Sequence, residues 1–539
     1  MQTHTFRSTR SEAAAARASF RLCPINSIGV AAASVQSIGW ILIEFQGRQS
    51  NAGRTVARAR RGGTLYDVQT IMAQRTPAYG TRRRGAAPRN RIRRFLNVGP
   101  MLARVFIGYK WISFREQRKG KAWGEPKRER HHYWSARKFY ETAVTNQGLL
   151  IKTGQFLGTR PDVLPDAYVE VLSGLQDEVP PESFEAIRAQ VERELGRPLY
   201  DIFAEFDERP VASASLAQVH RAVLKDGRVC AVKVQYPGIE HLVDIDLANM
   251  SFFISALNRL DRSMDYRFVA EEMRKHIPLE LDFINEGHNA ERIAADFANV
   301  EDIVVPKIYW DYTSRRVLTM EYIDAVKVTD IAGMKAIGVD PWDAAKILVF
   351  AFAEMIVRHG FFHADPHPGN LMVLPGPKLV LIDFGQAKDL GPAFQQVLVR
   401  FTRTLLSGDN AKMGEAFRAL GFRTKRDDAT GYEELGDAYF GRATRHVVET
   451  GAGWTEGEVF EQSYVDVTQL MRKNPLTAVP PELLMIGRVF GLLNGLSKTL
   501  QARTNMLFAF AQLADEIEAG QIDGAVPAGS AGSRRLLDS

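Results

Sequence analysis

The hydrophobic positions in the first part of the chain recur with the spacing of helices. Between residues 91 and 121, apolar and aromatic side chains interleave with basic ones, which is the pattern of a basic amphipathic helix. Helical spacing continues over residues 134–159, and after a proline-interrupted stretch another helix is expected over residues 181–195. We therefore expect residues 91–199 to form an N-terminal helical extension.

The periodicity changes near residue 200. Apolar side chains alternate there over short segments, and Asp226-Gly227 is a hairpin turn signal. A long helical pattern follows at residues 268–299. Five strands are expected, at residues 200–208, 216–224, 228–235, 303–308 and 316–322. Residues 200–322 are therefore predicted to be a small lobe with an antiparallel sheet and one long helix.

Beyond residue 341 the pattern is almost wholly helical up to residue 519, apart from a strand–loop–strand piece at residues 363–384. This predicts a helical lobe at residues 323–519, and the Gly-, Ala- and Ser-rich residues 520–539 are expected to be a loose tail. The fold class is thus α+β, with a small sheet lobe, a large helical lobe and a ligand crevice between them.

The basic charge of the chain is concentrated at one end. Residues 1–140 contain 28 Lys and Arg but 6 Asp and Glu, whereas the net charge of the whole chain is +6. Because the basic side chains are not spread over the fold, we expect no nucleic-acid partner. The amphipathic helix at residues 91–121 is instead a candidate for contact with an anionic membrane surface. Its alternative is a helix packed on the body with a solvated basic face.

Residues 1–90 form a basic, irregular segment that is poor in acidic residues. It is interpreted as a disordered tail, as the product of a start codon upstream of a true start at Met72, or as a targeting segment similar to a transit peptide. No stretch has the pattern of a transmembrane helix, because polar side chains interrupt residues 27–45, and Arg488, Asn494 and Lys498 form a polar stripe in residues 483–500. We expect a cytoplasmic or peripheral-membrane protein, with organelle targeting as an open possibility.

The strand–loop–strand piece carries the strongest chemical motif. Asp365 and Asn370 lie five residues apart in the sequence His-Ala-Asp-Pro-His-Pro-Gly-Asn, and Asp383 opens an Asp-Phe-Gly motif after an apolar strand. A protein-kinase catalytic loop and its magnesium-binding motif have the same order and spacing. Asp365 is therefore predicted to be the catalytic base or orienting residue, and Asn370 and Asp383 are predicted to bind Mg²⁺.

A kinase-like site also needs a lysine that binds the phosphates of ATP. Lys233 ends the sequence Cys-Ala-Val-Lys on the predicted strand 228–235, upstream of the catalytic loop. Three carboxylates near the long helix compete to be its partner, namely Glu280, Asp282 and Glu286. Residues four apart share a helix face, so Asp282 and Glu286 are expected to be neighbours, and Glu286 is the predicted partner of Lys233.

The loop expected to cover the phosphates is unusual, because it contains no glycine. Kinases have G-x-G-x-x-G here, whereas this chain has Ala212-Ser213-Ala214-Ser215 followed by Gln218. Small side chains still allow close approach of the backbone to phosphate, but alanine restricts positive φ. We expect ATP binding with a stiffer loop or an altered nucleotide preference.

Together these motifs resemble the UbiB family of atypical kinases, a branch of the protein-kinase-like superfamily, over residues 91–499. The most specific marker is K-T-G-Q at residues 152–155 with R-P-D-V-L-P at residues 160–165, which looks like the K-x-G-Q motif of the family. The sequence E-L-D at residues 280–282 looks like its E-x-D motif. The alanine-rich loop and the catalytic-loop motif complete the resemblance.

The resemblance implies that the K-x-G-Q helices lie over the crevice where a protein substrate would dock. Lys152 would then face Glu280 and Asp282, and is both a catalytic and a gating candidate. The gating residues implied are Lys152, Gln155, Glu280 and Asp282. The ATP-binding residues implied are Ala212, Ser213, Ala214, Ser215, Gln218, Lys233, Glu286, Glu321 and Ile323.

The resemblance also implies a function. Members of the family support the biosynthesis of isoprenoid quinones such as ubiquinone at a membrane surface, and bind ATP with magnesium. The expected partners are ATP, an anionic membrane surface with isoprenoid lipid, and enzymes of quinone biosynthesis. Two alternatives stay open, a small-molecule kinase of the aminoglycoside or choline kinase type and a nucleotide-binding scaffold for a biosynthetic complex.

The residues after Asp383 favour ATP hydrolysis over phosphorylation of proteins. An ordinary kinase has a long activation segment that ends in Ala-Pro-Glu. Here Gly385 is followed by a few residues, Gly391-Pro392 and a helical pattern, with no such motif. A docking platform for peptides is therefore not expected.

Overall fold

The computed structural model describes residues 58–61, 64–67, 90–158, 164–175, 181–260, 267–407, 410–436, 474, 476–502, 509–510 and 512–517. Within the basic segment 1–90, the described residues are Asn90 and the two strands of a hairpin, β1 (Arg58–Arg61) and β2 (Thr64–Asp67). The predicted motif residues Arg160 and Asp162, the helical pattern at residues 437–473 and the tail 520–539 lie outside the described residues.

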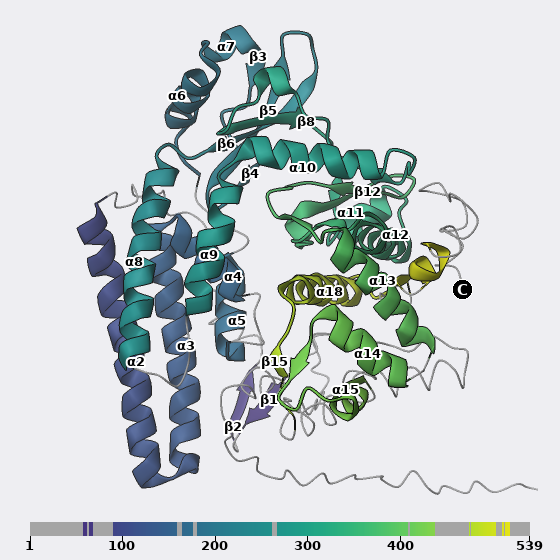
Figure 1. Cartoon of the computed structure of the whole chain (residues 1–539). Helices are drawn as coiled ribbons and strands as arrows, with labels where there is room; N and C mark the ends of the chain where they lie inside the picture. Colours follow the sequence, from purple (N-terminus) through teal and green to yellow (C-terminus); the bar gives the residue numbers. More distant parts are fainter. Residues whose placement is uncertain are drawn as a thin grey trace, which may run out of the picture.

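The N-terminal extension is helical, as predicted. Helices α2 (Arg91–Lys119) and α3 (Lys121–Asn146) pack side by side and are joined at Gly120, whose φ of +83° favours glycine. Helix α8 (Ile239–Leu260) lies beside them (Figure 1), and a buried ion pair between Arg94 and Asp246 connects α2 to it. The extension continues with α4 (Leu149–Gly158), α5 (Asp166–Leu172) and the 3₁₀ turn η2 (Ser173–Leu175).

The small lobe contains an antiparallel sheet in the order β3-β5-β6-β8, with β4 paired to β5. Its strands are β3 (Phe203–Phe206), β4 (Ala212–Ser213), β5 (Ala217–Leu224), β6 (Val229–Gln235) and β8 (Val317–Glu321). Helix α6 (Phe184–Leu195) precedes it, and α7 (Leu199–Ile202) takes up the start of the strand expected at residues 200–208. The β5–β6 hairpin turns at Gly227, where φ is +87°.

Two expectations for the small lobe were wrong. The helix expected at residues 268–299 is two helices, α9 (Arg267–Glu280) and α10 (Phe283–Asp296). Asp282 lies in the break and caps α10, because its side chain accepts hydrogen bonds from the amides of Ile284 and Asn285. Strand β7 (Ile303–Val304) belongs to the other lobe, since it pairs parallel to β12. The turn η3 (Trp310–Tyr312) follows it.

The large lobe is mostly helical and holds the catalytic-loop motif between short strands. A mixed sheet has the order β7-β12-β11-β9, and β10 pairs with β13. These strands are β9 (Val326–Lys327), β10 (Phe361–His363), β11 (Leu371–Leu374), β12 (Lys378–Leu381) and β13 (Ala387–Asp389). The helical elements are α11 (Ile331–Ala336), α12 (Pro341–Ala353), the π-helical turn η4 (Glu354–His359), the 3₁₀ turn η5 (Pro368–Asn370), α13 (Pro392–Ser407), α14 (Asn410–Leu420), α15 (Ala429–Gly436) and α18 (Pro481–Thr499). Strands β14 (Arg423–Thr424) and β15 (Leu476–Ala478) form a separate pair.

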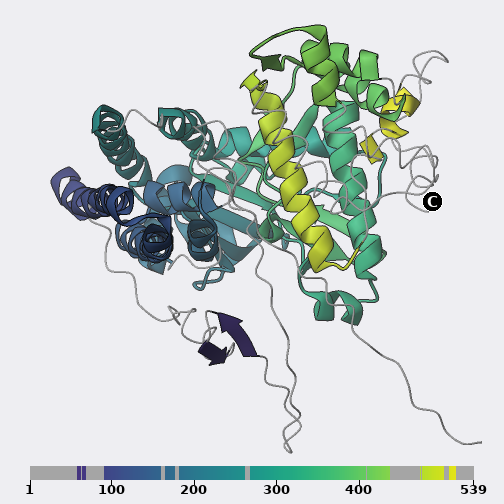
Figure 2. The same ribbon diagram turned by 90° about the horizontal axis from the view of Figure 1, so that it is seen from below.

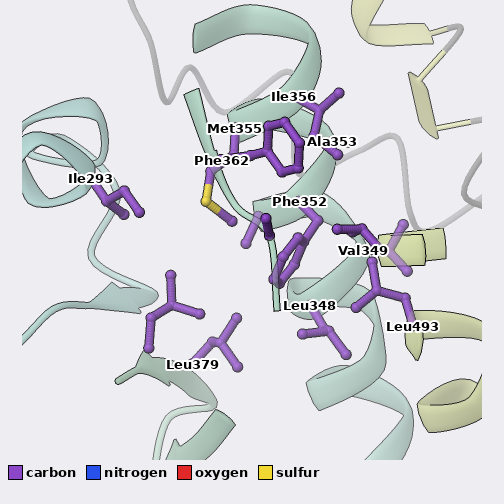
Figure 3. Close-up of a cluster of buried hydrophobic side chains, with 14 of the residues drawn as sticks. Ile293, Leu348, Val349, Phe352, Ala353, Met355, Ile356, Phe362, Leu379 and Leu493 are labelled. Atoms are coloured by element: carbon purple, nitrogen blue, oxygen red, sulfur yellow. The ribbon is translucent and has the colours of Figure 1, made fainter. Parts of the chain in front are cut away.

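Helices α12 and α18 pack against each other in the centre of this lobe (Figure 2). The largest hydrophobic core surrounds them, and Figure 3 shows Leu348, Val349 and Phe352 of α12 beside Leu493 of α18. Full burial of an aliphatic or aromatic side chain contributes about 1.5–3 kcal/mol. The expected bilobal, kinase-like α+β fold is thus confirmed, and no helix among the described residues is apolar and long enough to cross a bilayer.

Candidate active site

A cavity of about 1840 Å³ lies between the two lobes and reaches the helical extension. Most of the predicted site residues line it, namely Lys152, Gln155, Ala212, Ser213, Ala214, Ser215, Lys233, Glu280, Glu286, Glu321, Ile323, Asp365, Asn370 and Asp383. The small lobe lines the cavity with residues between Arg209 and Ile323, and the large lobe lines it with the catalytic loop and the segment around Asp383. Ligand pockets commonly have volumes of about 300–1,000 Å³, so this cavity has room for more than one small molecule.

The predicted lysine–glutamate pair is formed. Lys233 Nζ donates to both carboxylate oxygens of Glu286, at 2.7 and 2.9 Å, and lies 3.3 Å from Asp383 Oδ1. Strand β6 and the first turn of α10 therefore hold the lysine against the metal-ligand candidate of the other lobe. Burial alone would lower the pKa of Lys233, but the negative charges of Asp383 and Glu286 outweigh it and raise this pKa above its usual value.

Asp383 remains ionised in this site. Desolvation in the crevice opposes the charge, but the nearby cations Lys233 and Lys152 outweigh it and hold the pKa of Asp383 at about 2. The backbone of Asp383 has a φ of +62°, in the left-handed region. The amide of Gly385 also donates to its Oδ1, at 3.4 Å.

Buried His363 connects the catalytic loop to the strand before Asp383 by two hydrogen bonds. Its Nδ1 accepts a hydrogen bond from the amide of Asp365 at 3.2 Å, so its Nε2 is the atom that donates to the carbonyl of Ile382, at 3.3 Å. The side-chain amide of Asn370 donates to the carbonyl of Asp365, at 3.1 Å. These bonds fix Asp365 and Asn370 relative to the strand that leads into Asp383.

Asp365, Asn370 and Asp383 also share a smaller recess of about 60 Å³, which Lys152 and Lys233 line as well. Asn370 and Asp383 offer an amide and a carboxylate oxygen. Mg²⁺ prefers such oxygen ligands, and usually completes its shell with water and substrate phosphates rather than with a full protein cage. The residues present therefore fit a magnesium ion bound together with a nucleotide. Among the described residues no cluster of three or more His, Cys, Asp or Glu offers a separate metal site.

The alanine-rich loop is held by hydrogen bonds within the sheet. The amide of Ala214 donates to the carbonyl of Ala217 at 2.8 Å, and the hydroxyl of Tyr236 donates to the carbonyl of Ala214 at 2.9 Å. These bonds hold the backbone of the loop at Ala214 without a glycine. The stiffer loop and the altered nucleotide preference both stay predictions.

Gln218 was wrongly assigned to the ATP site. Successive side chains of a strand point to opposite faces, and in β5 the neighbours Ala217 and Val219 face the cavity. Buried Gln218 instead accepts a hydrogen bond from the amide of Glu182, at 2.8 Å, and lies 2.8 Å from the ring nitrogen Nε2 of His220. It connects the sheet to the segment that precedes α6.

The four predicted gating residues make three different kinds of contact. Lys152 of α4 forms an ion pair with Glu280 at 2.8 Å, and the charges of Glu280, Asp365 and Asp383 raise its pKa although burial opposes this. Gln155 donates to the carbonyl of Leu175 at 2.9 Å and so closes α4 onto the turn η2. Asp282 does not complete the expected pair of acids facing Lys152, because its carboxylate caps α10.

The glycine of the K-T-G-Q sequence has a packing role. A Cβ at Gly154 would lie 2.3 Å from Leu175 Cδ1 and 3.2 Å from the ring of Phe139. Glycine therefore lets α4 approach η2 and α3, and this contact positions the Lys152 side chain toward the crevice.

Two cavity residues, Arg488 and Gln386, had no predicted role. Arg488 Nη2 donates to Asp365 Oδ1 at 2.8 Å, and Gln386 Nε2 donates to Glu280 Oε1 at 2.6 Å. The available signal was the charge of Arg488 within the apolar run 483–500, which we interpreted as part of a polar stripe. Its direction into the crevice depends on where α18 docks, and periodicity does not specify that.

Comparisons with known proteins identify related chains. A family model described as the ABC1 atypical kinase-like domain matches residues 174–417. AarF domain-containing protein kinase 1 of Mus musculus is 32% identical over 393 residues, which cover 70% of this chain and 73% of that protein. The Gallus gallus protein of the same name is 36% identical over 295 residues, which cover 54% of this chain and 57% of that protein.

Among solved structures, a complex of Rv3197 with erythromycin from Mycobacterium tuberculosis matches with a TM-score of 0.48 and 24% identity, over 67% of this chain and 90% of that chain. The match with the chicken relative spans little more than half of its length, whereas that with the mouse relative spans nearly three quarters. On the family model, the identity to the mouse protein and the motifs gathered in the crevice, the chain belongs to the UbiB family of ABC1/AarF atypical kinases.

Proposed function

We propose that this kinase-like protein binds ATP with Mg²⁺ in the crevice and cleaves the γ-phosphate, chiefly with water as acceptor, in support of isoprenoid-quinone or other prenyl-lipid metabolism at a membrane surface. The observation that carries the ATP part is the convergence of Lys233, Glu286 and Asp383. Lys233 Nζ lies 2.7 Å from Glu286 within the small lobe and 3.3 Å from Asp383 of the large lobe. A lysine held between two carboxylates is placed to bind phosphate oxygens as a point charge.

The chain supplies a separate group for each task of phosphoryl transfer. Lys233 would bind phosphate oxygens, and Asn370 and Asp383 would hold the magnesium ion, which neutralises charge on the phosphates when bound. Asp365 would accept the proton of the attacking group. Glu321 and Ile323, at the end of β8, line the part of the cavity where the base of the nucleotide would lie.

The segment after Asp383 supports water or a small molecule as the acceptor. Strand β13 begins four residues after Asp383, and α13 begins at Pro392. The chain here contains no long segment on which a peptide could dock. Helix α4 is connected to this region, because Lys152 pairs with Glu280 and Glu280 accepts a hydrogen bond from Gln386. A protein substrate would therefore have to displace it.

Turnover of ATP tests the proposal. The wild-type protein should release phosphate only with Mg²⁺, and Asp383→Asn should reduce turnover by about 100-fold or more, as for other charged metal ligands. The matched control is Asp389→Asn, because this exposed carboxylate lies in the same segment and pairs with Arg292 outside the cavity. Equal turnover in the wild type and Asp383→Asn would contradict the assignment of the metal site.

The membrane part of the proposal is supported by one face of α2. Large apolar side chains are exposed there at helical spacing, namely Ile92, Leu96, Ile107, Trp111 and Phe114, with exposures of 50–69%. Arg115 and Arg118 lie over the rings of Trp111 and Phe114, at 5.5 and 4.3 Å from the centroids. Phe95 on another face packs against Phe253 of α8, with ring centroids 4.9 Å apart. The helix thus has one face for the protein and another suited to an anionic lipid surface.

Sedimentation with liposomes tests this surface. The protein should bind vesicles that contain anionic lipid, should bind neutral phosphatidylcholine vesicles less, and should be released by salt. Trp111→Ala with Phe114→Ala should weaken binding while ATP turnover without lipid is retained. Equal binding of the wild type and this double variant would exclude α2 as the contact surface.

A small-molecule kinase is the second candidate function, and the size of the cavity favours it. The volume of 1840 Å³ exceeds the usual range of a single ligand site, which leaves room for an acceptor beside ATP. Transfer of labelled γ-phosphate to a purified metabolite would support this function. A nucleotide-binding scaffold remains the third candidate, and full complementation of a deletion strain by Asp383→Asn would favour it.

A further inference from the structure

Arg488 is fixed in the crevice by the helix that carries it. Helix α18 buries Ile486, Val489 and Leu493 in the core of the large lobe, and Arg488 on the adjacent face lines the cavity. Its side chain is 15% exposed. Because the backbone of α18 is held by this packing, the guanidinium has little freedom to leave the crevice.

The guanidinium of Arg488 connects the two loops that carry the catalytic chemistry. Nη2 donates to Asp365 Oδ1 at 2.8 Å, and Nη1 donates to Gln386 Oε1 at 3.3 Å. Asp365 is the base candidate of the catalytic loop, and Gln386 directly follows the Asp-Phe-Gly motif. A planar guanidinium has donors in a fixed fork, so it sets the separation of these two loops.

The contacts continue from Gln386 to the helical extension. Gln386 Nε2 donates to Glu280 Oε1 at 2.6 Å, and Glu280 pairs with Lys152 at 2.8 Å. Hydrogen bonds and an ion pair thus link Asp365 through Arg488, Gln386 and Glu280 to Lys152 of α4. One of the two carboxylate oxygens of Asp365 already accepts a charge-assisted hydrogen bond, which is the strong type. Arg488 thus covers one side of Oδ1, which leaves Oδ2 as the oxygen better placed to accept a proton from an attacking group.

We propose that Arg488 is a positioning residue that selects the acceptor. By occupying Oδ1 of Asp365 and the space beside it, Arg488 favours attack by water over attack by a larger hydroxyl compound or a serine or threonine side chain. This inference rests on the proposed function, since it concerns the fate of the γ-phosphate of ATP at the same site.

The reaction balances in both cases. The attacking oxygen forms a bond to the γ-phosphorus, the bond from that phosphorus to the β,γ-bridging oxygen breaks, and its electron pair leaves with ADP. The proton of the attacking group passes to Asp365 Oδ2 and then to solvent. Water yields inorganic phosphate, whereas a hydroxyl side chain yields a phosphate ester.

The test is the partition of labelled phosphate. The full-length protein is incubated with γ-labelled ATP and Mg²⁺, and the label on protein is compared with the label in inorganic phosphate. In Arg488→Ala the ratio of protein-bound to free label should rise about tenfold or more, equivalent to a change of about 1.4 kcal/mol between two barriers. Arg488→Lys, which keeps a cation near Asp365, should return the ratio toward the wild-type value.

Lys498→Ala is the matched control, because Lys498 lies on the exposed side of the same helix, and its ratio should equal that of the wild type. An unchanged ratio in Arg488→Ala overturns the inference, whether or not turnover falls. If Arg488→Ala does not fold, Arg488→Gln, which keeps much of the side-chain volume, is judged by the same criterion. A wild-type protein that releases no label from ATP would refute the proposed function itself, which is a separate result.

Discussion

At the scale of single residues, Asp383 combines a strained backbone with a strongly stabilised charge. A φ of +62° is uncommon for a residue with a side chain, and such conformations persist where the surroundings enforce them, often at functional sites. Here the preceding strand β12, the amide of Gly385 and the ion pair with Lys233 hold the residue. The Asp-Phe-Gly motif was evident in the sequence, whereas this conformation was not, because it depends on contacts with the other lobe.

Lys152→Ala tests whether the lysine of the K-T-G-Q sequence acts on the site or stabilises the fold. We expect altered nucleotide selectivity or autophosphorylation, because the variant removes a cation that faces Glu280, Asp365 and Asp383. The melting temperature should change little, and Lys138→Ala is the control, since Lys138 forms an exposed pair with Glu141 on α3. A collapse of the melting temperature in Lys152→Ala alone would show that the lysine is structural.

Gly154→Ala tests the packing of α4. The added Cβ would meet Leu175 Cδ1 at 2.3 Å, and overpacking of a core usually costs about 1–3 kcal/mol. We expect the free energy of unfolding to decrease by this amount, which lowers the midpoint of urea unfolding. Gly491→Ala on α18 is the control, because its Cβ would meet nothing within 4 Å and alanine is favoured over glycine in helices by up to about 1 kcal/mol. Equal stability of Gly154→Ala and the wild type would contradict the packing role.

At the scale of elements, the sequence predicted most helices and strands but not their partners. Strands β5, β6 and β8 lie within the ranges expected from alternation. The parallel pairing of β7 with β12 joins residues far apart in the chain, and no local pattern reports it. The break between α9 and α10 was also missed, although Asp282 is a favoured N-cap residue, because the hydrophobic spacing continues across it.

The pair α2 and α3 is predicted to lose stability in acid. Burial, followed by the charges of Arg128 and His131, lowers the pKa of His132 to about 4, and its Nδ1 lies 2.6 Å from the hydroxyl of Tyr109. The unfolded chain therefore binds a proton as the pH falls below about 6.5, while the folded chain stays neutral at His132 down to about pH 4. The free energy of unfolding should decrease in this window by about 1–2 kcal/mol, after allowance for partial exposure.

Thermal or urea unfolding between pH 7 and pH 4 measures this effect. His132→Gln keeps a polar side chain but does not titrate, so its loss of stability over the window should be smaller than that of the wild type. Parallel curves for the two proteins would show that His132 does not stay neutral in the folded helix pair.

At the scale of the whole molecule, the two lobes and the extension meet around one crevice. The order and spacing of the Lys233, Asp365, Asn370 and Asp383 motifs were sufficient to predict that these side chains meet, because kinase-like chemistry constrains them together. The position of Arg488 could not be predicted in this way, since it depends on the docking of α18 against α12. The residues that carry the chemistry can be recognised from motifs in the sequence. The location of a residue that positions them, such as Arg488, depends on tertiary packing.

Calorimetric titration of ATP with and without Mg²⁺ tests the central claim most directly, with the wild type, Lys233→Met and Asp383→Asn compared under the same conditions. If Lys233 binds the phosphates and Asp383 the metal, the wild type should bind ATP at least about tenfold more tightly with Mg²⁺, a difference of about 1.4 kcal/mol, and Asp383→Asn should lose most of this difference. Lys233→Met should bind ATP more weakly under both conditions. Equal affinities in all three proteins, independent of Mg²⁺, would contradict the account.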